Sequence, residues 1–492
     1  MKRFFALIIA IVCVFSLCGS ASAYEGETLE VPQIRIVTEN GNGTSLQKED
    51  GYQSAHITIT DTDGSVLEDD ALIKVRGNST ALSWVEKKSF TIKYSKKRNV
   101  LQMGNAKKWA LLANLFDPTL IRNYIGLDTA ASLGLEYTSQ QRISELWLDG
   151  EYRGCYILTE PIGDGTDRVN IDIDNGEFIV EYEATRKEPD VTYIHPEGFR
   201  FAVKEPDPVT DDERDRISGI MADIISTVKS GSMEEISQKI DIPSFVKYYL
   251  LNEYLKTVDF GFSSVFFYYR NDVLYAGPAW DYDLSMGNAN PDYSASSQKA
   301  YVYDGLFANE KNLFAVLCGY DWFNYEVKKA YEEYGAVFSN IGADGGLIDT
   351  LSAEYRNVFD RNYREAGWNV SRYWVNVQKK PLSTYDENLS YLKSWCVQRD
   401  LWLTYWFSSQ KYYIRGDSDS DGEVTVMDAT NIQKILAYLI TDYDEMTVVR
   451  SKTSDDNLSV LDATLIQKYL AHISNPNRIN EAVKYSPSDT NS

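Results

Sequence analysis

The segment Asp417-Ser-Asp-Ser-Asp-Gly-Glu-Val-Thr-Val-Met-Asp428 places oxygen-bearing side chains at positions 1, 3, 5, 9 and 12 of a twelve-residue loop. Gly422 stands at position 6, where a sharp turn is needed, and the carboxylate at position 12 can complete an oxygen shell for Ca²⁺. A helical pattern begins at once, at Ala429. The segment therefore predicts a calcium loop followed by a helix, rather than a solvated acidic loop. The predicted ligands are the carboxylates of Asp417, Asp419, Asp421 and Asp428, the backbone carbonyl of Glu423, and Thr425 directly or through water.

A second copy of this unit follows. Residues 460–470 repeat the pattern of residues 426–436, and Asp462 takes the place of Asp428 at an offset of 462 minus 428, which is 34 residues. The two copies resemble the dockerin family over residues 414–473. The resemblance implies a small all-α module that binds the cohesin domain of a scaffoldin, as in cellulosome-type assemblies of polysaccharide catabolism.

The second loop has fewer carboxylates than the first. Aligned on Asp462, it offers Ser451, Thr453, Asp455 and Ser459, and Asp456 stands where the glycine is expected. Because ligand charge sets much of the affinity for Ca²⁺, we expect a weak or empty site at Asp455 and Asp462.

The chain before the repeat is long and changes character along its length. Residues 33–94 contain alternating or β-branched runs, which predict strands, and a helix is expected from Asp117-Pro118 onward. Strands return at residues 145–159 around Asp149-Gly150. From Thr210 the pattern is mostly helical, with a strand pair at residues 265–276. This order predicts an α+β body in two lobes.

Several ordered motifs in this body resemble the CotH family of spore-coat-type, kinase-like proteins. They are Arg76-Gly-Asn-Ser-Thr80, Lys87-Lys-Ser-Phe-Thr-Ile-Lys93, Trp109-Ala-Leu-Leu-Ala-Asn114 with Asp117, Ile121-Arg-Asn123, Glu145-Leu-Trp-Leu-Asp-Gly-Glu-Tyr-Arg-Gly-Cys-Tyr156 with Glu160, and Gly277-Pro-Ala-Trp-Asp-Tyr-Asp-Leu284. The resemblance implies a bilobal atypical protein kinase that transfers a phosphoryl group from ATP, with Mg²⁺ or Mn²⁺, to Ser or Thr of secreted proteins.

Phosphoryl transfer requires an aspartate near the accepting hydroxyl, acids that hold the metal, and cations on the phosphates. Asp259 follows an apolar helix and is the candidate catalytic aspartate; Asp281, 22 residues later, is the candidate magnesium ligand, shared with Asp283. Lys93 is the candidate phosphate lysine, and Arg76 a further phosphate contact. Lys88 and Lys204 are the competing choices for Lys93.

One residue departs from the kinase pattern. Ser264 stands five residues after Asp259, where kinases place an asparagine on the second Mg²⁺. Serine is a poorer metal ligand, so a non-catalytic pseudokinase that acts as a binding or structural module stays open, as does a purely structural role for the aspartates. The scarcity of extracellular ATP favours the pseudokinase. A third alternative is a carbohydrate-active enzyme, which needs two carboxylates across a glycosidic bond.

The N-terminus and the composition indicate where the protein acts. Lys2 and Arg3 precede an apolar stretch and Ala21-Ser-Ala23, which is the layout of a secretory signal peptide. The net charge of -23 argues against nucleic acid as a partner, and no membrane span is expected. We expect a secreted, extracellular protein in a cell-surface or cellulosome-type complex. The predicted divisions are a signal peptide at 1–23, the kinase-like domain at 24–408, the dockerin at 409–475 and a disordered tail at 476–492.

Overall fold

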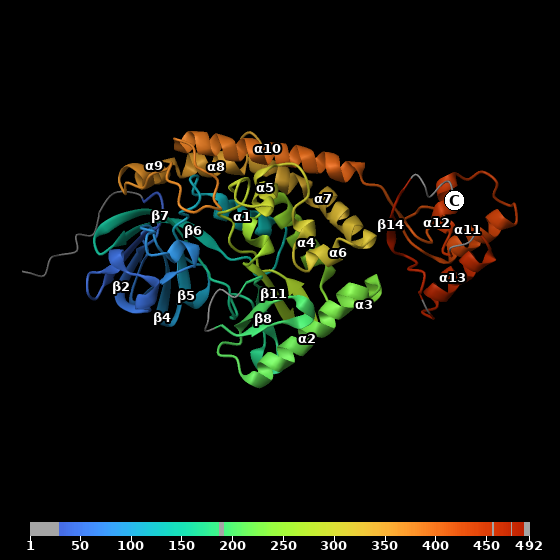
Figure 1. Cartoon of the computed structure of the whole chain (residues 1–492), viewed down its shortest axis with the longest axis horizontal. Helices are drawn as coiled ribbons and strands as arrows, with labels where there is room; N and C mark the ends of the chain where they lie inside the picture. Colours follow the sequence, from blue (N-terminus) through green and yellow to red (C-terminus); the bar gives the residue numbers. More distant parts are fainter. Residues whose placement is uncertain (1–28, 186–190, 455–456, 474, 487–492) are drawn as a thin grey trace, which may run out of the picture.

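The computed structural model describes residues 29–185, 191–454, 457–473 and 475–486. The expected signal peptide lies outside these residues, and so does Asp455 of the second loop. Figure 1 shows a β-barrel at one end of the molecule, a mixed helical and β region in the middle, and a small helical module at the other end.

Seven strands form the barrel: β1 (Gln33–Thr38), β2 (Gln53–Thr60), β3 (Val66–Arg76), β4 (Ser89–Asn99), β5 (Asn105–Leu112), β6 (Gln141–Leu148) and β7 (Glu151–Thr159). The order around the closed barrel is β1-β2-β3-β4-β5-β7-β6. A parallel pairing of β1 with β6 closes it, while the other neighbours are antiparallel. Alternate apolar side chains, such as Ile57 and Ile59 of β2, are buried as the period of a strand requires.

A separate sheet follows the barrel: β8 (Phe178–Tyr182), β9 (Tyr193–Ile194), β10 (Phe201–Glu205), β11 (Val265–Arg270) and β12 (Val273–Ala276). Its order is β12-β11-β8-β10-β9, with every neighbouring pair antiparallel. The register between β10 and β8 shifts between Val203 and Glu205. Such a bulge re-aims the side chain at that point, here Lys204.

The helices of the body are α1 (Arg122–Ser132), α2 (Asp211–Ser230), α3 (Met233–Ser237), α4 (Ile242–Leu255), α5 (Ala295–Tyr301), α6 (Phe314–Leu317), α7 (Asp321–Gly342), α8 (Leu347–Glu354), α9 (Arg356–Arg364) and α10 (Tyr385–Ser409). The long helix α10 extends along one side of the molecule toward the C-terminal module (Figure 1). A buried ion pair of 2.6 Å between Glu253 and Arg399 joins α4 to α10. Glu253 also accepts the backbone N–H groups of Phe307 and Ala308, so its charge is well compensated.

The predicted mixture of strands and helices is confirmed, including the hairpin at Asp149-Gly150 and the strand pair of β11 and β12. The first helix begins later than expected, at Arg122 rather than at Asp117-Pro118. Asp117 still caps it, because its carboxylate accepts the N–H of Arg122 at 2.7 Å, while Leu120 at φ +65° interrupts the helical path before that residue.

The C-terminal module contains α11 (Val426–Leu436), α12 (Glu445–Ser451) and α13 (Val460–Leu470), and a strand pair of β13 (Tyr412–Ile414) with β14 (Ala482–Lys484). Helices α11 and α13 pack through Ala429, Ile432, Ala463 and Ile466. The expectation of a disordered tail from residue 476 is corrected for β14. This strand is ordered because it pairs with β13 and because the N–H of Lys484 donates to Asp321 Oδ2 at 3.0 Å.

The three cysteines outside the N-terminal segment, Cys155, Cys318 and Cys396, are free thiols. None of the helices in the described part of the chain is long and apolar enough to cross a membrane.

Candidate functional site

A cavity of about 250 Å³ lies where the barrel meets the five-stranded sheet. The barrel contributes Arg76 at the end of β3, the following residues 77–80, and Ser89 at the start of β4. The sheet contributes Glu181 of β8 and Lys204 of β10. The cavity thus collects side chains that are far apart in the sequence, including Glu183, Asp259, Ser264, Asp281 and Asp283.

Two segments that carry the predicted aspartates run beside each other. Asp259 lies in the 3-10 helix η6 (Val258–Gly261), which follows α4, and the N–H of Val258 donates to Leu284 O at 3.0 Å. This bond holds η6 against the segment that contains Asp281 and Asp283. The three aspartates therefore face one cavity, as the sequence analysis expected.

Motif residues from α1 fix the second of these segments. Asn123 accepts the N–H of Tyr282 through Oδ1 at 2.6 Å, and Arg122 Nε donates to Ser285 O at 3.0 Å. Arg122 is fully buried and forms an ion pair of 2.5 Å with Asp117. The Ile121-Arg-Asn123 motif therefore holds the segment that carries Asp281 and Asp283, and Asn123 but not Arg122 lines the cavity.

The carboxylate of Asp283 is buried and surrounded by other acids. Burial raises its pKa well above the ordinary range, and the negative charges of Asp281 and Asp259 raise it further. A buried acid beside like charges is costly unless it is protonated or bound to a cation. The cluster thus provides charge for which a divalent cation is the natural counterpart.

A chain of polar contacts connects the two sides of the cavity. Lys204 Nζ lies 3.2 Å from Glu181 Oε2, and Glu181 Oε1 accepts the N–H of Ser264 at 2.8 Å. Ser264 Oγ in turn donates to Asp281 Oδ2 at 3.0 Å. Glu181 therefore orients a lysine with one oxygen and the Ser264 backbone with the other.

Ser264 and Asp281 both have left-handed backbone conformations, with φ of +60° and +70°. Non-glycine residues in this region cost free energy and persist where surrounding contacts hold them. Their mutual hydrogen bond and the Glu181 contact provide that constraint. Backbone strain of this kind is typical of functional sites.

Arg76 brings positive charge to the barrel side of the cavity. Its guanidinium lies 5.2 Å from the ring centroid of Trp280, and burial lowers its pKa to about 10. Its Nη1 is buried and has no hydrogen-bond partner within the part of the chain that the structure describes. Gly77 follows at φ +95°, and a Cβ there would lie 2.0 Å from Thr80 Oγ1, so only glycine fits this turn.

The structure does not bring Lys93 to this cavity. Lys93 lies further along β4, 5.3 Å from the ring centroid of Tyr52, and it lines a different groove. The competitor Lys204 lines the cavity instead, so Lys93 as the phosphate lysine stays a prediction that the cavity does not support. Lys88 is buried and donates to the carbonyl oxygens of Ala81 and Leu82.

Glu181 and Glu183 were not among the residues predicted for the site. Both are buried, and both line the cavity on one face at the end of β8. Their signal is the spacing of two acids at i and i+2 at the end of an apolar run, Phe178-Ile-Val-Glu-Tyr-Glu183.

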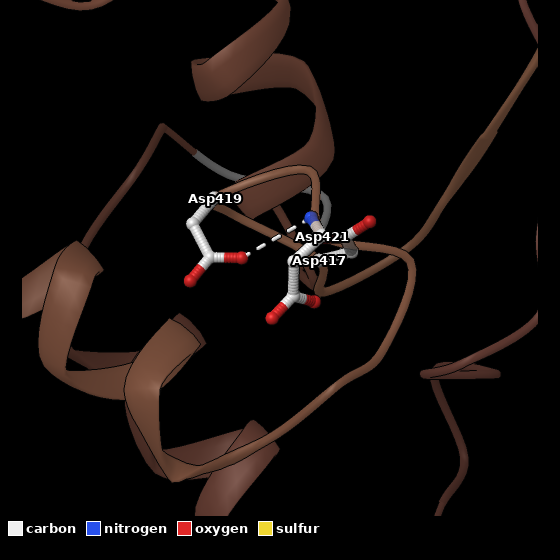
Figure 2. Close-up of side chains that lie close together, drawn as sticks. All are labelled: Asp417, Asp419 and Asp421. Atoms are coloured by element: carbon white, nitrogen blue, oxygen red, sulfur yellow. Dashed lines mark hydrogen bonds between the residues drawn. The ribbon is translucent and has the colours of Figure 1, made fainter.

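A second cluster of acids lies in the C-terminal module. Within the described residues, Asp417, Asp419 and Asp421 form the one group whose candidate ligand oxygens all lie within 4.8 Å of one another (Figure 2). Gly422 has φ +93°, as the turn at position 6 requires. Burial raises the pKa of Asp417 and of Asp419, and the nearby Asp428 raises both further.

Asp428 is fully buried at the start of α11. Its Oδ1 accepts the N–H of Ser418 at 2.7 Å, and its Oδ2 accepts the N–H of Thr425 at 2.7 Å. The predicted position-12 carboxylate thus closes the loop, although it stands outside the group of three. The Glu423 carboxylate is exposed, which agrees with a ligand role through the backbone alone.

The second loop is one residue shorter than the alignment assumed. Asp462 Oδ1 accepts from Thr453 N at 2.8 Å, nine residues away, whereas Asp428 accepts from Ser418, ten residues away. Thr453 is therefore the counterpart of Ser418, and Lys452, not Ser451, is the counterpart of Asp417. A lysine thus occupies the position of the first calcium ligand.

The Oγ of Ser454 donates to Asp462 Oδ1 at 2.8 Å, and the N–H of Ser459 donates to its Oδ2 at 2.8 Å. Burial would raise the pKa of Asp462, but hydrogen bonds from Ser454 and Ser459 outweigh it and the pKa is lowered. Hydrogen bonds within the loop therefore already compensate the Asp462 carboxylate.

The sequence profile of the family described as CotH kinase protein matches residues 73–403, about two thirds of the chain. The matched range includes every residue of the cavity between the barrel and the five-stranded sheet. The chain belongs to the CotH kinase protein family. No curated protein matches the chain.

Proposed function

We propose that the body of this protein is an ATP-dependent Ser/Thr protein kinase of secreted proteins. The observation that carries the proposal is the meeting of three aspartates, a lysine held by a glutamate, and an arginine with a buried unpartnered nitrogen in one cavity. These are the elements that phosphoryl transfer needs, since catalysis of that reaction is mainly positioning and charge neutralisation. The cavity between barrel and sheet supports a bilobal arrangement.

The residues fit a nucleotide with Mg²⁺ or Mn²⁺. The buried Nη1 of Arg76 has no hydrogen-bond partner among the described residues, so a phosphate oxygen can accept its hydrogen bond. The pKa of Asp283 is raised by burial and by neighbouring acids, so a bound cation would stabilise its charged form. Asp281 and Asp283 would hold the metal, with Ser264 orienting Asp281. Bound ATP supplies the phosphoryl group. Two carboxylates suffice for such a site, because Mg²⁺ usually keeps several waters and phosphate oxygens among its ligands.

The remaining residues have separate roles. Lys204 and Arg76 would neutralise phosphate charge, and Glu181 would hold Lys204 in place. Asp259 lies on the η6 turn, lines the same cavity as Asp281 and Asp283, and would accept the proton of the substrate hydroxyl.

The direct experiment is incubation of the protein with labelled ATP and Mg²⁺ or Mn²⁺, alone and with secreted proteins, beside an Asp259→Ala variant. Label transfer that the variant loses supports the kinase. Absence of transfer with retained nucleotide binding supports a pseudokinase instead. The Ser264 substitution favours this second candidate, because a second metal would lack its usual asparagine.

We further propose that the C-terminal module is a calcium-dependent dockerin that attaches the protein to a cohesin in an extracellular, cellulosome-type complex. The loop geometry of Asp417, Asp419 and Asp421 supports calcium binding. Exposed apolar residues at equivalent places in both repeats support docking, since exposed apolar patches mark interaction surfaces. These residues are Val426 and Met427 at the start of α11, and Val460 and Leu461 at the start of α13.

Calcium-dependent binding to cohesins tests the dockerin. We expect the double variant Asp417→Ala with Asp428→Ala to lose calcium binding and cohesin binding together. Tight cohesin binding by that variant in a chelator would contradict the proposal.

A further inference from the structure

The charge of the chain is distributed unevenly. Residues 87–116 contain eight lysines and arginines and no aspartate or glutamate, in a protein with 72 acidic residues and a net charge of -23. Two of the eight, Lys87 and Lys88, are buried and bonded to carbonyl oxygens. The other six lie on β4 and β5, and Arg98 among them pairs with Asp69.

Five lysines of this hairpin remain, and we call them the basic hairpin: Lys93, Lys96, Lys97, Lys107 and Lys108. Within the described residues, none of the five forms an ion pair or a side-chain hydrogen bond with an acid. Lys93 and Lys108 are direct cross-strand partners. Like charges directly opposite each other destabilise a sheet, so an external anion bound beside Lys93 and Lys108 would relieve their repulsion.

Acids near the hairpin do not remove this excess. Lys97 feels the charge of Asp164 and Lys108 that of Glu205, without a direct contact in either case. A wide groove of about 930 Å³ follows the hairpin and is lined by Lys93 and Lys107. Two of the three acids that line the groove are already in ion pairs, Asp69 with Arg98 and Asp70 with His56. The third, Glu39, has no ion pair among the described residues.

The groove also has apolar surface, and strand β4 contributes residues both to it and to the cavity that contains the aspartates. Val37 and Leu72 line it and are 55% and 38% exposed. Strand β4 starts in the cavity at Ser89 and reaches the groove at Lys93. Four residues of strand span about 13 Å, so one extended polypeptide can contact both places.

We propose that the basic hairpin binds an acidic segment of the phosphoacceptor protein and thereby presents a nearby hydroxyl to the cavity. The choice of polypeptide follows from charge complementarity, the exposed apolar residues of the groove and the course of β4 from the cavity to the groove. The phosphoacceptor part rests on the proposed kinase function, whereas binding of the acidic segment is independent of catalysis.

The test measures the binding of two labelled peptides by fluorescence anisotropy. One peptide consists of glutamates with one serine and one leucine, and in the other every glutamate is replaced by glutamine. The variant Lys96→Glu with Lys97→Glu and Lys107→Glu is compared with Lys411→Glu, Lys434→Glu and Lys468→Glu, which changes the net charge equally at exposed positions elsewhere. We expect the hairpin variant to bind the acidic peptide at least about tenfold more weakly, and the control variant to bind within about twofold of the parent. Equal losses in both variants, or binding of the glutamine peptide as tight as that of the acidic one, would overturn the proposal.

Two further arms separate the alternatives. Displacement of the peptide by polygalacturonate at lower concentration than by polyglutamate would assign the surface to an anionic polysaccharide and overturn the protein partner. Asp281→Ala should leave peptide binding unchanged. If the parent fails to bind nucleotide while the lysine dependence of peptide binding persists, the kinase function fails and the docking surface stands.

Discussion

Ser264 Oγ donates a hydrogen bond of 3.0 Å to Asp281 Oδ2, although both residues have left-handed backbones. The serine at the position of the kinase asparagine thus contacts the aspartate that we propose as the metal ligand. This relationship gives Ser264 a positioning role that can be tested apart from the chemistry.

We expect Ser264→Ala to weaken nucleotide binding in the presence of Mg²⁺ by roughly tenfold to a hundredfold, because a hydrogen bond to a charged group contributes about 1.5–3 kcal/mol. Ser264→Asn should retain binding, since asparagine tolerates positive φ and its amide can contact the aspartate or the metal. Calorimetric titration with ATP measures both. Equal weakening by Ala and Asn would remove the positioning role.

The raised pKa of Asp283 predicts a pH dependence of stability. Between the ordinary pKa of an aspartate and the raised value, the folded protein binds a proton that the unfolded chain lacks, so stability falls as pH rises through this window. Metal-free Asp283→Asn should therefore be more stable than the parent near pH 7 and no more stable near pH 4. Thermal unfolding at the two pH values checks the sign, and Mg²⁺ should raise the melting temperature of the parent alone.

The different positions of Lys93 and Lys204 predict opposite outcomes for the two lysines. Lys204→Met should strongly reduce ATP affinity, because Lys204 lies in the cavity beside Glu181. Lys93→Met should leave ATP affinity unchanged, because Lys93 contacts Tyr52 on the outer barrel. Glu181→Gln should also reduce ATP affinity, but by less than Lys204→Met. A loss of ATP affinity in Lys93→Met comparable to that in Lys204→Met would support Lys93 as the phosphate lysine.

The local motifs were sufficient to predict the elements and most of the acids of the site. Turn signals such as Asp149-Gly150 and the capped helices depend on short-range chemistry, which a single sequence shows. The position of Lys204 is next to a bulge between β10 and β8, which the sequence does not show. The one-residue deletion in the second loop becomes visible only from the backbone N–H of Thr453 that donates to Asp462. The bulge pairs residues far apart in the sequence, whereas the loop register is a local choice of hydrogen-bond donor; the repeat pattern alone predicts neither.

The structure predicts one calcium ion per chain. Lys452 replaces the first ligand of the second loop, and Ser454 and Ser459 already satisfy Asp462. Asp417→Asn should abolish calcium binding, while Asp462→Asn should leave the stoichiometry unchanged and lower stability. The lowered pKa of Asp462 means that its contribution is present above the ordinary pKa of an aspartate and is lost as pH falls through the lowered value. A stoichiometry of two by calorimetry would refute this assignment.

The segment after α13 fastens the C-terminal module to the body. Glu481 is buried and accepts the N–H of Met233 in α3 at 3.1 Å, and the N–H of Lys484 donates to Asp321 at the start of α7. Arg478 lies 5.8 Å from the ring centroid of Tyr320, which adds a third contact. The module is therefore held at two places, through β13 after α10 and through β14.

We expect Glu481→Ala with Asp321→Ala to release the module without unfolding it, because neither residue touches the calcium loop or the packing of α11 on α13. Proteolysis within residues 408–412 should become faster, and the radius of gyration in solution scattering should increase. Calcium affinity should stay at the parent value, and removal of residues 487–492 serves as the control. An unchanged scattering profile and cleavage rate in the double variant would show that β13 and the linker alone orient the module, and that the contacts of β14 contribute little to its position.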